Sequence, residues 1–175
     1  MNSNLMCFRE NAIQIFVINK DKETDMLYLG IDPGKNGAIA ALTENGYFFD
    51  IADLSDIEGD IWIALSKFDF VKLVTIERVG AFPEQGRTSI FNFGQIYGMI
   101  KMAMAAKGWR YQTVAPVKWR KILDSSVPAK PSKEDLRAFA LRRWPEAKNF
   151  LARKKDHNRA EALILAYYGY ITDRN

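Results

Sequence analysis

The chain has 175 residues, of which 48% are hydrophobic and 26% are charged, a composition typical of a soluble globular protein. Its length fits one domain, and a single cysteine excludes a disulfide framework within the chain and favours a reducing, cytoplasmic compartment. No apolar run approaches the roughly 18 to 20 residues of a membrane helix, so we expect no membrane partner.

The net charge of +4 is unevenly distributed along the chain. Residues 1–77 carry 6 Lys and Arg against 13 Asp and Glu, whereas residues 78–175 carry 19 against 8. A basic half indicates a polyanionic partner, although a solvated lysine-rich surface would give the same count.

Residues 1–25 are predicted to be an N-terminal extension, either poorly ordered or adding an edge strand, and residues 26–175 to be one domain. The domain opens with short apolar or alternating runs over 27–31, 37–42 and 47–51, which read as strands. Asn45-Gly46 is a strong hairpin signal between the second and third runs. These segments predict an antiparallel meander.

The rest of the chain reads as helix, strand, helix and strand, followed by helices only. The predicted elements are a helix over 57–66, a strand over 73–76, a helix over 89–107, a strand over 110–114, a short helix over 116–123, a helix over 132–144 and a last helix over 158–170. Gly108 is placed to end the long helix, and Ser132 with Asp135 forms a capping box. This order predicts an α/β fold with a mixed five-stranded sheet, three antiparallel strands followed by parallel strands, flanked by helices.

Carboxylates stand at the ends of predicted elements. Asp32 and Glu77 each follow an apolar strand, and Asp156 and Glu161 flank the start of the last helix. If the two strands are neighbours, their carboxylates repel unless a divalent cation joins them. Asp32 could instead only open a turn, Glu77 only end a surface strand, and Asp156 only complement a helix dipole. Glu161 is harder to dismiss, because its helix is otherwise apolar.

Four short segments carry a family resemblance by their order and spacing: Gly30–Gly34, Ile76–Val79, Phe93–Gly98 and Arg159–Leu163. Over roughly residues 26–170 the chain resembles the RuvC-type Holliday junction resolvases, especially the divergent phage, poxvirus and organellar branch. The resemblance implies an RNase H-like nuclease domain that hydrolyses DNA at four-way junctions with two Mg²⁺ or Mn²⁺ ions, leaving 5′-phosphate and 3′-hydroxyl ends. It also implies a DNA-containing compartment, nucleoid-associated or viral.

By this resemblance, Asp32, Glu77 and Glu161 are catalytic metal ligands. The family places a further acidic residue or histidine three positions before the last ligand, where this chain has Asn158. We expect Asp156 to be the fourth catalytic ligand, because it can turn inward if the last helix begins at Asn158. His157 is the alternative ligand or a proton-handling group.

The resemblance also implies branched DNA as the partner of a two-fold homodimer, with the helix over 89–107 contributing to the interface. Lys133 resembles a family lysine near the active site, although a surface lysine is the plainer interpretation. Phe82 is the candidate junction wedge, or simply a loop hydrophobe, and Trp119 is expected in the core. The candidate phosphate-binding residues are Lys118, Arg120, Lys121, Lys133, Arg137 and Arg159.

Three alternatives stay open. Another RNase H-like nuclease, acting on flaps or RNA–DNA hybrids, would use the same metal chemistry. The segment Asp32–Gly37 also resembles the phosphate loop of sugar kinases and actin-like ATPases, but their second lobe scarcely fits this length. A non-catalytic branched-DNA-binding protein is disfavoured by the retained carboxylates.

Overall fold

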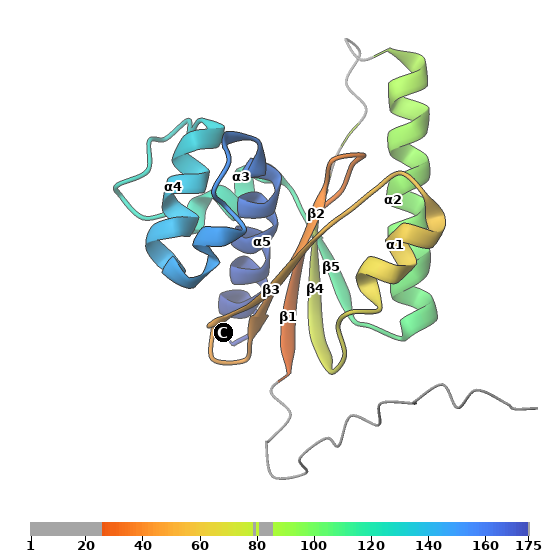
Figure 1. The fold of residues 1–175 in the computed structure, drawn as a ribbon, viewed down its shortest axis with the longest axis horizontal. Helices are drawn as coiled ribbons and strands as arrows, with labels where there is room; N and C mark the ends of the chain where they lie inside the picture. The colour runs from red at the N-terminus through yellow and green to blue at the C-terminus, as the bar shows by residue number, and fades with distance from the viewer. Residues whose placement is uncertain (1–25, 79, 81–85, 175) are drawn as a thin grey trace, which may run out of the picture.

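One mixed sheet organises the molecule (Figure 1). The computed structural model describes residues 26–78, 80 and 86–174. The strands are β1 (Leu27–Asp32), β2 (Ala38–Thr43), β3 (Phe48–Asp53), β4 (Val71–Glu77) and β5 (Tyr111–Val114), in the spatial order β3-β2-β1-β4-β5. β1 to β3 are antiparallel neighbours, and β1, β4 and β5 run parallel. The predicted five-stranded α/β fold is confirmed.

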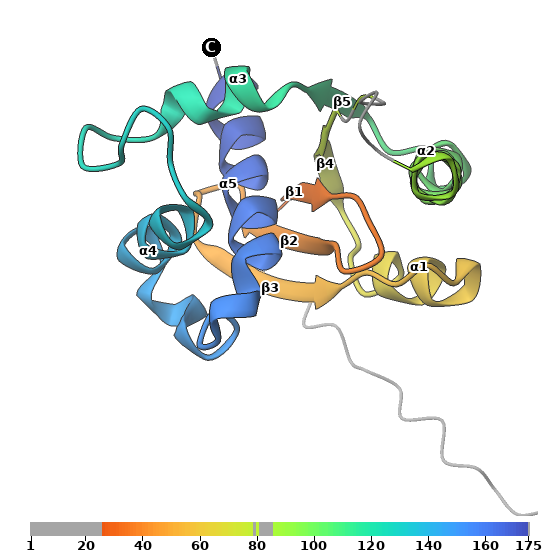
Figure 2. The ribbon, with the colours of Figure 1, turned by 90° about the horizontal axis from the view of Figure 1, so that it is seen from above.

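Helices cover both faces of this sheet (Figures 1 and 2). They are α1 (Glu58–Leu65), α2 (Arg87–Lys107), α3 (Pro116–Trp119), α4 (Lys133–Arg143) and α5 (His157–Thr172), with 3₁₀ turns η1 (Arg120–Ile122), η2 (Pro145–Asn149) and η3 (Lys154–Asp156). Seen from above, α5 lies across one face with α3 and α4 beside it, and α1 and α2 lie on the opposite side (Figure 2). β1 and β2 are almost entirely buried, which explains their continuous apolar sequences.

Two glycines let α5 approach the sheet closely. A Cβ built on Gly30 of β1 would lie 1.9 Å from the carbonyl oxygen of Ala162 in α5. A Cβ on Gly169 would lie 2.4 Å from the hydroxyl oxygen of Thr75 in β4. The backbone of α5 therefore packs directly against the backbone of β1 at Gly30. This contact sets the distance between α5 and the sheet at β1 and β4.

Local sequence signals agree with the observed elements. Gly46 has a φ of +79° in the turn between β2 and β3, and Gly108 ends α2 with a φ of +64°. The Ser132 hydroxyl accepts a hydrogen bond from the Asp135 amide, and the Asp135 carboxylate in turn accepts one from the Ser132 amide, completing the predicted capping box. Each predicted strand and helix is present, with bounds within two residues of those expected, except that the helix predicted over 116–123 ends as α3 at Trp119 and continues as the 3₁₀ turn η1 to Ile122.

Two features just before and at the start of the last helix differ from the prediction. The last helix begins at His157, one residue earlier than expected, and the 3₁₀ turns η2 and η3 before it were not predicted. The predicted extension, residues 1–25, lies outside the described residues. No helix in the described ranges is both long enough and apolar enough to cross a membrane.

Candidate active site

Asp32 and Glu77 are the last residues of two adjacent parallel strands. In the β1–β4 pairing, Ile31 stands opposite Ile76, so the next residue of each strand carries the carboxylate. Parallel strands end at the same edge of a sheet, and rigid strand backbone holds both side chains there. The predicted neighbourhood of Asp32 and Glu77 is therefore present.

Glu161 reaches the same edge from α5. It precedes Ala162, whose carbonyl lies against Gly30, two residues before Asp32. Burial raises the pKa of Glu161, and the charge of Glu77 raises it further. Burial also raises the pKa of Asp32 well above its ordinary value, followed by the charges of Glu161 and Glu77. Three mutually repelling carboxylates from distant parts of the chain thus form one cluster.

Glu77 has a partner that the sequence did not reveal. The indole N–H of Trp119 donates a hydrogen bond to Glu77 Oε1 at 3.0 Å, and both side chains are buried. Burial raises the pKa of Glu77, while this hydrogen bond and the charge of Arg120 act in the opposite direction. Trp119 lies in the core as expected, but its polar edge faces the cluster. A buried tryptophan next to predicted site residues is the signal that could have found it, because its N–H needs an acceptor.

Lys133 supplies positive charge beside the cluster. Its Nζ lies 2.8 Å from His157 Nε2, and its charge lowers the pKa of both Asp32 and Glu161. An ammonium group can only donate, so His157 Nε2 accepts this bond. The other ring nitrogen, Nδ1, lies 3.3 Å from the Lys154 carbonyl oxygen. His157 therefore lies between the backbone of η3 and Lys133.

Asp156 lies elsewhere than expected. It closes η3, and its carboxylate accepts hydrogen bonds from the backbone N–H of Arg153 at 2.8 Å and from the Arg153 guanidinium at 2.8 Å. Burial alone would raise the pKa of Asp156, but the hydrogen bonds from Arg153 and the charge of Arg159 outweigh it and lower the pKa. The structure does not bring Asp156 together with the other three carboxylates. The reason is that α5 begins at His157, which leaves Asp156 facing the two arginines.

The predicted basic residues divide into two groups. Arg137 donates to the Leu151 carbonyl oxygen at 2.7 Å and pairs with Glu134, and Arg159 pairs with Asp53. These two arginines are held within the fold. The other four predicted cations are exposed and lie on α3, η1 and α4: Lys118, Arg120, Lys121 and Lys133. Phe82, the candidate wedge, lies outside the described residues.

The donor chemistry of the cluster fits a hard divalent cation. Carboxylate oxygens are the ligands that Mg²⁺ prefers, and a cation would offset the repulsion that raises the pKa values of Asp32 and Glu161. In the present side-chain positions, no three His, Cys, Asp or Glu residues within the described ranges lie close enough to hold one ion. A shared cation would therefore have to draw Asp32, Glu77 and Glu161 closer together.

Comparisons with solved structures identify the fold. The structure of Thermus thermophilus RuvC in complex with a Holliday junction substrate superposes with a TM-score of 0.59 at 16% sequence identity, covering 85% of this chain and 95% of that one. A second Thermus thermophilus RuvC structure gives 0.56 at 16% identity, over 84% and 97%. The yeast mitochondrial Holliday junction resolvase Ydc2 gives 0.56 at 12% identity, over 79% and 75%.

These likenesses show that the chain has the fold of the RuvC-type resolvases, as its motifs had indicated. No family model matches the sequence, and no curated protein matches it by sequence.

Proposed function

We propose that this chain is a metal-dependent endonuclease that resolves four-way DNA junctions, with residues 26–175 as its nuclease domain. The observation that supports the proposal is that Asp32 and Glu77 end adjacent strands, and that Glu161 and Glu77 both act electrostatically on Asp32. These three carboxylates occur in a fold shared with junction resolvases, one of which was solved on a Holliday junction.

In this proposal Asp32, Glu77 and Glu161 hold Mg²⁺ or Mn²⁺, with two ions per site. Bound ions supply an activated water and stabilise the leaving oxygen of the phosphodiester. Trp119 orients the Glu77 carboxylate through its N–H, so one ligand is fixed before any ion arrives. The products would carry 5′-phosphate and 3′-hydroxyl ends.

Lys133 would stabilise the charge that develops on the attacked phosphate, because it lies beside the carboxylates and carries no carboxylate partner in the described part of the chain. His157 would direct the lysine by accepting its hydrogen bond. The exposed cations Lys118, Arg120 and Lys121 would contact the DNA backbone near Glu77.

Two symmetric cuts across a junction need two active sites at a matching spacing, and a two-fold homodimer provides them. The exposed apolar side chains of α2 make this helix the proposed interface.

The decisive experiment compares cleavage of an immobile four-way junction, a flap, a plain duplex and an RNA–DNA hybrid, with Mg²⁺ and with chelator. We expect paired symmetric nicks in the junction that require the divalent cation and that a ligase can seal. Preferred cleavage of the flap or the hybrid would instead assign the chain to a different RNase H-like activity. Junction binding without cleavage at any Mg²⁺ or Mn²⁺ concentration would leave only the non-catalytic alternative.

A further inference from the structure

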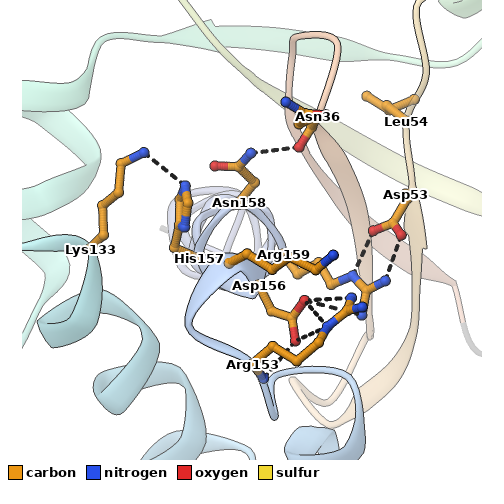
Figure 3. Close-up of a pocket in the computed structure, with 11 residues that line it drawn as sticks. Asn36, Asp53, Leu54, Lys133, Arg153, Asp156, His157, Asn158 and Arg159 are labelled. Carbon is orange, nitrogen blue, oxygen red and sulfur yellow. Dashed lines mark hydrogen bonds and ion pairs between the residues drawn. The ribbon is translucent and has the colours of Figure 1, made fainter.

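We propose that a hollow at the first turn of α5 binds a backbone phosphate of the DNA strand, next to the phosphate that is cleaved. This inference rests on the proposed function and adds a second contact point for the same strand. The hollow has a volume of about 570 Å³ and lies between the β1–β2 loop, the end of β3, α4 and the start of α5 (Figure 3). We call it the α5 hollow.

The α5 hollow carries an excess of positive charge. Its walls include the cations Lys133, Arg153, Lys155 and Arg159 and only two carboxylates, Asp53 and Asp156. Figure 3 shows Arg153 turned toward Asp156, and Arg159 turned toward Asp53. The two lysines are therefore the cations in excess.

The two arginines in the hollow are already paired. Both oxygens of Asp53 accept from the guanidinium of Arg159, at 2.6 and 2.5 Å, and Asp156 is bound by Arg153. Lys155 is exposed and has no ion pair or hydrogen bond through its side chain among the described residues. Its ammonium group is thus available to a ligand, and that ligand must be anionic.

The helix terminus adds to this preference. α5 has 16 residues, and its N-cap residue, Asp156, makes no capping hydrogen bond because its carboxylate faces Arg153 instead. The first-turn residues His157, Asn158 and Arg159 line the hollow. The positive end of the helix dipole favours an anion at this place.

The position of the hollow indicates which anion it takes. Lys133 lies in its wall, and the same ammonium group acts electrostatically on Asp32 and Glu161. Asn158 Nδ2 donates to the Asn36 carbonyl oxygen at 2.5 Å, which ties the hollow to the loop that follows Asp32. A strand whose scissile phosphate lies at the carboxylates would bring a neighbouring phosphate past Lys133 into the hollow.

The size of the hollow also fits a strand better than a free anion. A volume of about 570 Å³ is within the usual range of roughly 300 to 1,000 Å³ for small-molecule sites. It can hold a phosphate together with its attached sugar. We therefore assign it to a phosphodiester of the DNA backbone, with free inorganic phosphate as the competing source of the same chemistry.

The test replaces single phosphates of a junction strand, one position at a time, by neutral methylphosphonates. Cleavage rates are measured for the wild type, for Lys155→Met, and for Lys67→Met as the control. Lys67 is an exposed lysine after α1, outside the α5 hollow. Each pair of protein and DNA changes forms a double-mutant cycle, which isolates the contact between the lysine and one phosphate.

We expect one position flanking the scissile phosphate at which the methylphosphonate slows the wild type and Lys67→Met by about tenfold, in line with the loss of one charge-assisted contact. With Lys155→Met, the same replacement should cost less than about twofold, because the charge it contacts is already absent. Equal losses in all three proteins at every position would overturn the inference while leaving junction cleavage intact.

A second arm separates the two sources of phosphate. Inorganic phosphate is titrated into the three proteins, and its binding is followed by calorimetry. Phosphate binding that depends on Lys155, without coupling to any methylphosphonate position, would make the hollow a free-phosphate site and refute the DNA assignment. If the wild type cuts no junction, junction affinity replaces the cleavage rate in the same double-mutant cycle. A failure of the proposed nuclease function can then be distinguished from a failure of the phosphate contact at Lys155.

Discussion

Asp32 is held in an environment that opposes its ionisation. Burial raises its pKa well above the ordinary value, and the charges of Glu161 and Glu77 raise it further, whereas Lys133 lowers it. Like charges brought together without a counter-ion weaken the folded state. A cation held between Asp32 and the two neighbouring glutamates would relieve this repulsion.

The first prediction concerns pH. The pKa values of Asp32, Glu77 and Glu161 are all raised by burial, so the folded state binds more protons than the unfolded chain once the pH exceeds their ordinary values. Stability must then fall as pH rises through this window and level off above the folded-state pKa values. The pKa values of Asp53 and Asp156 are lowered, so the stability that these two carboxylates contribute is lost only as the pH falls below the ordinary value. They therefore do not change stability across the higher pH window.

We therefore expect the melting temperature in chelator to decline as the pH rises above the ordinary titration range of carboxyl groups, and Mg²⁺ to raise it most where the decline is complete. Thermal unfolding followed by circular dichroism measures this. A melting temperature independent of both pH and Mg²⁺ would contradict the cation-binding role of the cluster.

The second prediction is that Asp32→Asn lowers junction cleavage by about a hundredfold or more, because an amide cannot replace the ionised ligand. Junction affinity should be preserved, and stability in chelator should rise because one repelling charge is gone. Single-turnover cleavage, gel-shift binding and thermal melting measure the three effects. Asp69→Asn, an exposed carboxylate before β4, is the matched control and should behave as wild type. Full cleavage by Asp32→Asn would end the metal-site proposal.

The third prediction tests whether Trp119 positions the Glu77 carboxylate or serves only as a core residue. Trp119→Phe removes the donor to Glu77, and Trp144→Phe removes an equivalent buried donor to the Gly46 carbonyl oxygen, also at 3.0 Å. Both should lose about 1 to 3 kcal/mol of unfolding free energy in urea. Only Trp119→Phe should also slow cleavage and shift its pH profile to higher pH, because the pKa of Glu77 loses a lowering contact. Equal activities of the two variants would make Trp119 purely structural.

At the scale of elements, the packing of α5 on β1 assembles the cluster. The Gly30–Ala162 contact leaves no room for a side chain, since a Cβ would approach the carbonyl oxygen to 1.9 Å. A displacement of α5 by even one ångström would move Glu161 relative to Asp32. Small residues at this crossing are therefore a requirement of the site as well as of the core.

The fourth prediction follows from this contact. Gly30→Ala should destabilise the fold by more than about 3 kcal/mol and abolish cleavage, because helix backbone must shift. Gly94→Ala, in the interior of α2 with nothing within 4 Å of the new Cβ, should instead stabilise by about 0.5 to 1 kcal/mol. Urea unfolding of the two variants tests both directions. A Gly30→Ala protein as stable as wild type would show that α5 does not rest on β1 as described.

The elements themselves followed from local signals. Apolar runs bounded by Asp32-Pro33-Gly34 and Asn45-Gly46 indicated strands, and Ser132 with Asp135 indicated a helix start, because these residues act through their own backbone. The 3₁₀ turns around Lys154–Asp156 carried no such signal, since short turns depend on what packs against them. That difference of one turn decided where Asp156 points.

At the scale of the molecule, α2 leaves an apolar surface open. Phe91 and Met102 are 66% and 67% exposed, and their spacing of eleven residues places them on the same side of the helix. Beside Met102, a hollow between α1 and α2 is lined mostly by apolar residues, including Trp62 and Met99. A second copy of the chain would cover this surface in the proposed homodimer.

The fifth prediction is that sedimentation at micromolar concentration detects a two-chain species, and that Met102→Glu converts it to monomer by placing a charge in the contact. Val117→Glu makes the same change at an equally exposed position on α3 and should leave the assembly unchanged. A wild-type chain that sediments as a monomer would refute the dimer and, with it, coordinated cutting of the two junction strands.

The sequence alone determined the fold and three of the residues that form the cluster. Short apolar runs mark the buried strands, and a carboxylate at the end of such a run lies at the edge of the sheet, so the positions of Asp32 and Glu77 followed from their order along the chain. The basic half of the sequence also led to the prediction of a polyanionic partner.

Tertiary structure alone decided which charged groups are free to act. Asp156 and Arg159 looked available in the sequence, yet each is paired with a residue that the fold brings to it, whereas Lys155 is left without such a partner among the described residues. The physical reason is that an ion pair depends on distance in space, which chain order does not specify beyond one helical turn.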